Sequence, residues 1–330
     1  RRASIVLVGP ILAREGKAVF PYPGGCVIGK RPIDLFLDGW RAMGASAALK
    51  KNHFEIRARR LHGADFTFKI VSVTGTEALM MTAAVARGKT VLRNAACEPE
   101  IAALAEFFTR SGARISGAGT PTMKIIGTGG KLLRARGAFE VIPDRIEAGS
   151  FLMLGAALGT RIRVKHCNPE HLALVLSVLR DAGVQVKSGR DWVEVSRPRA
   201  LRSVDVKTKE YPGFATDLQA PYTVLMTQAT GQSMIFETIF EGRLNYIEEL
   251  NRMGASIVPC DPHRILVHGP TPLRGRAIES PDLRAGLAFI LAALIARGKS
   301  EISNIYQIDR GYEKIDERLR KLGADIVRSD

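Results

Sequence analysis

A cysteine in a loop rich in glycine and proline is the first candidate for chemistry in this chain. Cys26 lies within residues 23–32, where five of the ten residues are Gly or Pro, and this composition predicts an exposed loop. Lys30 and Arg31 follow within five residues of the cysteine, and such cations favour a thiolate or a bound anion beside it. The loop therefore indicates either a reactive thiol in an anion-binding site or a free cysteine on a surface turn.

Acidic and basic residues in later loops offer a second set of candidates. Asp217 and Asp282 stand near expected helix starts, where an aspartate often caps the helix by accepting hydrogen bonds from backbone amides. Arg284 and Arg310 belong to similar loops. Guanidinium groups bind carboxylates and phosphates in a forked geometry, but they also form ordinary salt bridges. For all four residues the structural and the functional interpretation stay open at this point.

The elements that must position these residues form a repeat of roughly 70 residues. In each repeat one Gly ends an apolar segment, and a second Gly follows about 25 residues later, as expected for glycines that end helices in a left-handed conformation. The two series are Gly16, Gly88, Gly159, Gly231 and Gly298, and then Gly44, Gly112, Gly183, Gly254 and Gly323.

Each repeat combines helices with short strands, which predicts α/β units. The last repeat predicts an apolar helix over 283–296, a strand over 300–302, an amphipathic helix over 312–322 with Leu322 on its buried face, and a closing strand over 324–327. The same plan predicts strands at 90–92, 233–236 and 256–258.

The repeats divide into two groups. We expect a boundary near Pro143, which gives a domain over 1–143 that carries the cysteine loop and a second domain over 144–330. A length of 330 residues suits two domains. Two matched domains predict a cleft between them, where ligands commonly bind.

Composition excludes several classes of protein. Hydrophobic content is 46% and charged content 25%, as in ordinary globular proteins, and no apolar run reaches about 18 residues, so no membrane span is expected. The four cysteines form no CxxC pair, which argues against zinc and favours a reducing cytoplasm. The net charge of +15 predicts anionic partners, but aromatic residues make up 6% and the charges are dispersed, which argues against nucleic acid.

A series of short motifs resembles the UDP-N-acetylglucosamine enolpyruvyl transferase family. In order along the chain these are PGGCxIGxRPxDL, SVTGTE, PDRIEAGSF, FATDLQA, ETIFEGR, DLRAG and IDRGYE. The resemblance implies an inside-out α/β barrel of two domains, each built from three βαβαββ units. It also implies a cytoplasmic transferase that moves the enolpyruvyl group of phosphoenolpyruvate to the 3-hydroxyl of UDP-N-acetylglucosamine. This is the first committed step of peptidoglycan synthesis, which releases phosphate and uses no metal or organic cofactor.

The resemblance also implies residue roles. Asp217 matches the base that takes the proton of the sugar hydroxyl, and Asp282 matches a residue that orients the arginine clamp. Cys26 matches a residue that takes part in acid chemistry and product release and that fosfomycin alkylates. Its glycine-rich loop is expected to close over the site when the sugar nucleotide binds. The implied clamps for phosphoenolpyruvate are Arg31, Arg284 and Arg310. The implied contacts to the sugar nucleotide are Arg2, Arg31, Pro32, Ile33, Asp34, Leu35, Val71, Ser72, Val73, Asp217 and Ile239.

A usual member of this family has about 90 further residues at its start, or roughly one repeat more. That segment carries a Lys–Asn pair that binds phosphoenolpyruvate. We therefore expect that the natural amino terminus is missing here and that the isolated chain is inactive or nearly so.

Three alternatives remain. A shikimate-type 3-phosphoshikimate 1-carboxyvinyltransferase shares the fold, but the cysteine loop and ETIFEGR argue against it. A non-catalytic UDP-sugar-binding paralogue is disfavoured because Cys26, Asp217 and Arg310 are all present. A nucleic-acid binder rests on the charge of +15 alone.

Overall fold

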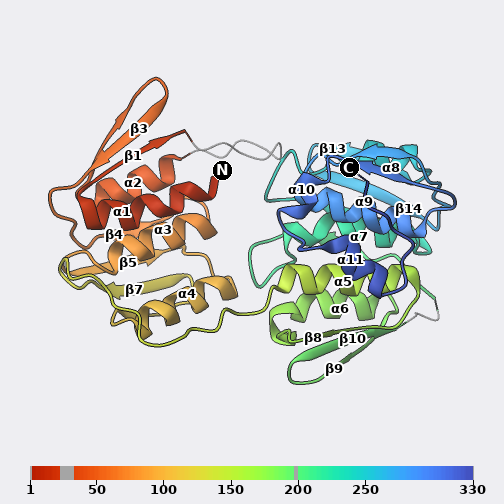
Figure 1. Ribbon diagram of the computed structural model, residues 1–330, viewed down its shortest axis with the longest axis horizontal. Coiled ribbons are helices and arrows are strands. Elements are labelled where there is room, and N and C mark those ends of the chain that lie inside the picture. Colours follow the sequence, from red (N-terminus) through yellow and green to blue (C-terminus); the bar gives the residue numbers. More distant parts are fainter. Residues whose placement is uncertain (1, 23–32, 197–199, 330) are drawn as a thin grey trace. The chain divides into compact units, whose positions relative to one another are not determined.

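The computed structural model describes residues 2–22, 33–196 and 200–329, with the side chains of residues 2 and 3 outside this description. Its contacts divide the described residues into two compact units that meet in the sequence between Ile142 and Pro143 (Figure 1). Unit 1 comprises residues 2–22 and 33–142, and unit 2 comprises residues 143–196 and 200–329. Each unit has its own hydrophobic core.

Unit 1 contains two sheets and the helices between their strands. Its elements are η1 (Arg2–Leu7), α1 (Val8–Glu15), β1 (Lys17–Pro21), α2 (Asp34–Ala42), β2 (Ser46–Leu49), β3 (His53–Arg57), β4 (Asp65–Thr67), α3 (Val73–Ala83), β5 (Lys89–Arg93), α4 (Pro99–Arg110), β6 (Arg114–Ser116) and β7 (Thr122–Ile126). The strand orders are β1-β3-β2 and β4-β5-β7-β6, with β4 parallel to β5 and the other pairs antiparallel.

Unit 2 repeats this arrangement. Its first elements are α5 (Arg145–Leu158), β8 (Ile162–Lys165), η2 (Pro169–Leu172), α6 (Ala173–Asp181), β9 (Gln185–Ser188) and β10 (Trp192–Ser196). The next are β11 (Val206–Lys207), η3 (Thr216–Leu218), α7 (Gln219–Met226), β12 (Gly231–Phe236), α8 (Ile247–Arg252), β13 (Ser256–Asp261) and β14 (Arg264–Gly269). The last are β15 (Ala277–Glu279), α9 (Leu283–Ile295), β16 (Glu301–Ser303), α10 (Tyr306–Asp309) and α11 (Ile315–Lys321).

The predicted α/β repeat is confirmed. The sheets β4-β5-β7-β6 and β11-β12-β14-β13 have the same strand order and the same single parallel pair, so both follow the βαβαββ plan. All ten periodic glycines have positive φ, from 64° to 111°. Gly16 shows the reason. At φ 69° its N–H donates to the carbonyl of Leu12, so Gly16 caps the end of α1, and β1 begins at the next residue.

Helices form the centre of unit 2. The three helices α5, α7 and α9 contact one another and lie side by side (Figure 1), and the strands of β8, β10, β12 and β14 contact α5 or α7. Residues 285–292 of α9 are all buried, as expected for a helix surrounded by protein. Close approach requires Gly286, where a Cβ atom would lie 2.4 Å from the side chain of Ile308. Sheets outside central helices match the predicted inside-out α/β unit.

The last repeat departs from prediction after β16. The predicted helix over 312–322 begins later, as α11, because Lys314 directly before it adopts a left-handed conformation with φ 45°. Leu322 is 58% exposed and not on the buried face as predicted, because α11 ends at Lys321 and Leu322 is its C-cap.

The predicted strand over 324–327 is also wrong. No strand is assigned there in the described part of the last repeat. This segment is instead held next to a helix, because the guanidinium of Arg328 donates to both carboxylate oxygens of Asp309 at 3.1 and 2.6 Å.

Candidate active site

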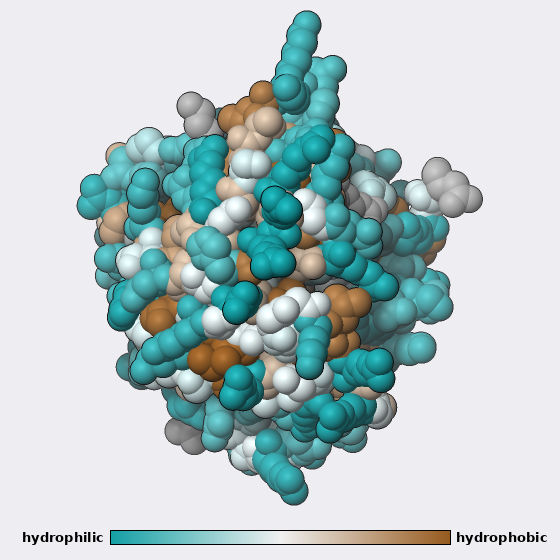
Figure 2. Space-filling model, turned by 90° about the vertical axis from the view of Figure 1, so that its left-hand side faces the viewer, coloured by the Kyte–Doolittle hydropathy of each residue, from teal (hydrophilic) through white to brown (hydrophobic). Residues whose placement is uncertain are grey.

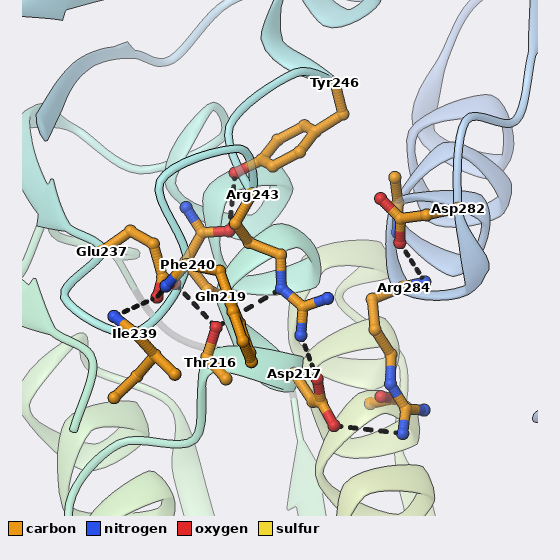
Figure 3. A network of polar contacts seen from close by, with 12 residues as sticks. Thr216, Asp217, Gln219, Glu237, Ile239, Phe240, Arg243, Tyr246, Asp282 and Arg284 are labelled. Carbon is orange, nitrogen blue, oxygen red and sulfur yellow. Dashed lines mark hydrogen bonds and ion pairs between the residues drawn. The ribbon is translucent and has the colours of Figure 1, made fainter. Parts of the chain in front are cut away.

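Two arginines converge on the carboxylate of Asp217 in unit 2 (Figure 3). Oδ1 of Asp217 accepts a hydrogen bond from Nη2 of Arg243, and Oδ2 lies 3.2 Å from Nη2 of Arg284. The carboxylate comes from η3, Arg243 from the loop after β12, and Arg284 from the first turn of α9. The side chain of Arg243 is 6% exposed, whereas that of Asp217 is 34% exposed, so the acid remains accessible and the arginine behind it is buried.

The two arginines keep Asp217 ionised. Burial alone would raise the pKa of this carboxyl, but the charges of Arg284 and Arg243 and their hydrogen bonds outweigh burial and lower the pKa below its ordinary value. A group with a lowered pKa is charged at neutral pH and accepts hydrogen bonds, but it is a weak base. The strength of Asp217 as a base therefore depends on how firmly the two arginines hold its carboxylate.

Hydrogen bonds at its backbone and at its guanidinium fix the position of Arg284. Its backbone N–H donates to Oδ1 of Asp282 at 2.7 Å, so that Asp282 caps α9. Its Nη1 donates to the hydroxyl of Tyr312 at 3.1 Å, and that hydroxyl lies 3.3 Å from Oγ of Ser150. Asp282 thus orients the backbone that carries the arginine, while Tyr312 and Asp217 orient its guanidinium.

A buried carboxylate supports the other arginine. Glu237 is 0% exposed, and its Oε1 accepts the N–H of Ile239 at 2.8 Å and that of Phe240 at 3.1 Å. Its Oε2 accepts the hydroxyl of Thr216 at 2.8 Å, and that hydroxyl accepts Nε–H of Arg243 at 3.3 Å. These supporting residues are not among the predicted site residues, although the motifs FATDLQA and ETIFEGR contain Thr216, Glu237 and Arg243.

Unit 2 brings together most of its predicted site residues. Asp217, Arg284 and Asp282 are linked by the contacts above, and Glu237 holds the backbone of Ile239 beside them (Figure 3). Arg310 is exposed, and its Nη1 donates to Oε1 of Gln307 at 2.8 Å. Among the described contacts Arg310 does not join the group around Asp217.

The predicted residues of unit 1 gather at two helix starts. Asp34 is the first residue of α2, and Ser72 caps α3 by accepting the N–H of Gly75 at 3.1 Å. The two helices contact each other, and a Cβ atom on Gly75 would lie 2.6 Å from the side chain of Leu35. The positive ends of helix dipoles attract anions. The neighbouring positions Ile33, Val71 and Val73 are half-buried.

Some predicted residues cannot be placed. Cys26, Arg31 and Pro32 lie outside the described residues, as does the side chain of Arg2.

Within the described ranges no group of three or more His, Cys, Asp or Glu side chains is arranged to hold a metal ion. No helix in the same ranges is both long and apolar enough to cross a bilayer. Figure 2 shows one face, on which hydrophilic side chains are widely spread with apolar patches between them.

The fold is that of an enolpyruvyl transferase. The family model of EPSP synthase (3-phosphoshikimate 1-carboxyvinyltransferase) matches residues 1–319, and the chain belongs to this family. It is 49% identical over 329 residues to the UDP-N-acetylglucosamine 1-carboxyvinyltransferase of Acidobacterium capsulatum, with 99% of this chain and 74% of the relative covered. The enzyme of the same name from Koribacter versatilis is 46% identical, with 99% and 75% covered.

Solved structures show the same fold. The enolpyruvyl transferase NikO from Streptomyces tendae superposes with a TM-score of 0.88 at 26% identity, covering 99% of this chain and 77% of the other. An EPSP synthase from Acinetobacter baumannii superposes with a TM-score of 0.76 at 19% identity, covering 100% and 79%. These matches confirm the predicted fold class and the predicted resemblance, and the relatives named above favour the UDP-sugar branch over the shikimate branch.

Proposed function

We propose that this chain transfers the enolpyruvyl group of phosphoenolpyruvate to the 3-hydroxyl of UDP-N-acetylglucosamine with release of phosphate. The observation that carries the proposal is the ionised carboxylate of Asp217 between Arg243 and Arg284. The names of the relatives at 43–49% identity supply the acceptor.

In the proposed addition step, Asp217 takes the proton of the sugar hydroxyl while the oxygen of that hydroxyl bonds to C2 of phosphoenolpyruvate. The π electrons of the enol then take a proton at C3. Loss of a proton from C3 and departure of phosphate from C2 restore the double bond. Each positioned proton transfer contributes about 10²–10⁴-fold in rate.

The donor itself can make Asp217 a better base. Phosphoenolpyruvate carries a carboxylate and a phosphate, which arginine forks bind bidentately. When it engages Arg284, the ion pair between Arg284 and Asp217 weakens, and the pKa of Asp217 rises toward its ordinary value or above. The acid would then gain basicity when the donor is in place.

Several finer assignments belong to the same proposal. Arg284, Arg310 and Arg31 would bind phosphoenolpyruvate, and Asp282 would orient the clamp. Cys26 would act in acid chemistry from the domain over 1–143, and the second domain over 144–330 would supply the base. The helix starts at Asp34 and Ser72, with their predicted neighbours, would bind the sugar nucleotide, and Ile239 would contact it from unit 2. The proposed setting is the cytoplasm, at the first committed step of peptidoglycan synthesis.

Phosphate release from the full gene product tests the proposal, because the relatives extend beyond the 74–78% of their length that this chain covers. We expect release to require both phosphoenolpyruvate and UDP-N-acetylglucosamine. The matched control replaces the sugar nucleotide by shikimate 3-phosphate. Release with the shikimate ester, and none with the sugar nucleotide, would overturn the assignment of the acceptor.

A further inference from the structure

Glu237 is a buried carboxylate that requires an explanation. It is 0% exposed, and a buried charge is costly unless hydrogen bonds compensate it. Three donors do so: the amides of Ile239 and Phe240 at Oε1, and the hydroxyl of Thr216 at Oε2. The carboxylate therefore holds the loop that follows β12 and, at the same time, one side chain of η3.

The hydroxyl of Thr216 has a fixed polarity in this arrangement. The carboxylate oxygens of Glu237 accept from Thr216, Ile239 and Phe240, and a guanidinium only donates. Thr216 must therefore donate its hydrogen to Glu237, and its oxygen must accept Nε–H of Arg243 at 3.3 Å. Glu237, Thr216 and Arg243 form a directed chain that ends on Oδ1 of Asp217.

We infer that Glu237 and Thr216 are positioning residues for the acid Asp217, because they fix the Arg243 guanidinium against it. The loop that Glu237 holds also carries Ile239, the proposed contact to the acceptor sugar. One buried carboxylate thus sets both the orientation of the acid's partner and the backbone at the proposed acceptor site. This inference goes beyond the proposed function but rests on it for the role of Asp217.

Other groups also face Asp217, and the test must separate their effects. Arg284 faces it from α9, and Tyr312 and Asp144 act on Arg284 in turn. The ring of Phe240 lies 5.5 Å from the Arg243 guanidinium. Neither Arg284 nor Tyr312 has a described contact with Thr216, so Arg243 is the described group that links the Thr216 hydroxyl to the carboxylate of Asp217.

The test compares Thr216→Val with Thr216→Ser. Valine keeps the shape of the side chain but removes the hydroxyl, whereas serine keeps the hydroxyl. Thr227→Val is the control, since Thr227 also lies in unit 2 and its hydroxyl bonds to the carbonyl of Val224, away from Asp217. Two measurements apply: the pKa of the Asp217 carboxyl by carbon-13 NMR of the unliganded protein, and the pH profile of kcat/KM.

Thr216→Val should raise the pKa of Asp217, because a less firmly held Arg243 stabilises the carboxylate less. The acid limb of the kcat/KM profile should move to higher pH. Despite the higher pKa, kcat should fall about 10-fold because Asp217 is less firmly positioned, the size expected for loss of a hydrogen bond to a charged group. Thr216→Ser should retain the wild-type pKa and profile, and Thr227→Val should lower thermal stability without moving either. An unchanged pKa in Thr216→Val, or the same rise in Thr216→Ser, overturns the inference.

Glu237→Gln provides a second route if Thr216→Val does not fold. Glutamine keeps an acceptor for the loop amides but presents N–H to Thr216, so it competes with Arg243 for the same oxygen. We expect the pKa of Asp217 to rise here too, and an unchanged value contradicts the inference. The pKa measurement needs no turnover. If both substrates give no phosphate release while the pKa still rises in Thr216→Val, the proposed function fails and the positioning chain stands.

Discussion

Oδ2 of Asp217 lies 3.2 Å from Nη2 of Arg284, which follows it by 67 residues in the chain. The contact joins the start of α7 to the start of α9, two helices that pack against each other. Each of these helices is the first long helix of its repeat, so the repeat itself brings the acid Asp217 and the cation Arg284 to the same end of unit 2. The consequences can be measured at several residues.

Asp217→Asn should remove the proposed base while retaining its shape. We expect turnover to fall about 10²–10⁴-fold, with the affinity for UDP-N-acetylglucosamine changed little in calorimetry. Asp205→Asn is the control, because the carboxylate of Asp205, which also lies in unit 2, accepts the N–H of Met234 at an exposed position and has no described contact with Arg243 or Arg284. Normal turnover in Asp217→Asn would rule out its role as the base.

Arg310→Lys tests an arginine whose described hydrogen bond is to Gln307. If Arg310 binds the donor, replacing its fork by a point charge should raise the KM for phosphoenolpyruvate about 10-fold. The KM for the sugar nucleotide should stay the same. Arg297→Lys, at an exposed position shortly after the end of α9, provides the comparison. Equal KM values in wild type and Arg310→Lys would remove Arg310 from the clamp.

Cys26→Ser tests the cysteine of the loop rich in glycine and proline. We expect this variant to lose most of its turnover near neutral pH. Covalent labelling by fosfomycin, as detected by mass spectrometry, should disappear. Cys260→Ser is a suitable control, since Cys260 is an exposed free cysteine elsewhere in the chain. Labelling that persists in Cys26→Ser, or disappears in Cys260→Ser, would assign the reactive thiol differently.

Glu77 predicts a pH dependence of stability. Burial, together with the charges of Glu100 and Glu98, raises its pKa to about 7. The folded state then binds more protons than the unfolded state between the ordinary carboxyl pKa and about 7, so the free energy of unfolding should decline as pH rises through this window. Below the window the group is neutral in both states and contributes no penalty.

Glu77→Gln should therefore reduce that decline and increase stability above pH 7, with little effect at pH 4. Denaturant unfolding at several pH values measures it. Glu106→Gln, at an exposed position on α4, should leave the pH dependence as in wild type. A parallel loss of stability at all pH values in Glu77→Gln would show that its pKa is not raised.

Short-range features of this chain could be predicted from the sequence because they depend on the backbone of single residues. A glycine that ends a helix must adopt a conformation with positive φ, and the periodic glycines all do so. The predicted strands at 90–92, 233–236 and 256–258 lie within β5, β12 and β13. The apolar helix predicted over 283–296 is α9, which begins at Leu283 and ends at Ile295, one residue before its predicted end. The motifs, being local, were enough to indicate the family.

The roles of Asp217 and Asp282 show what only the tertiary structure decided. Both precede an apolar helix, and the sequence left both open as helix caps. Asp282 is a cap, since its carboxylate accepts amides of its own first turn. Asp217 is not, because its carboxylate meets Arg243 and Arg284, which lie 26 and 67 residues away. Capping depends on neighbours in the chain, whereas an ion pair across repeats depends on how helices pack. Leu322 was misassigned for a local reason, because α11 ends one residue before it and Leu322 therefore leaves the helical spacing that predicted its burial.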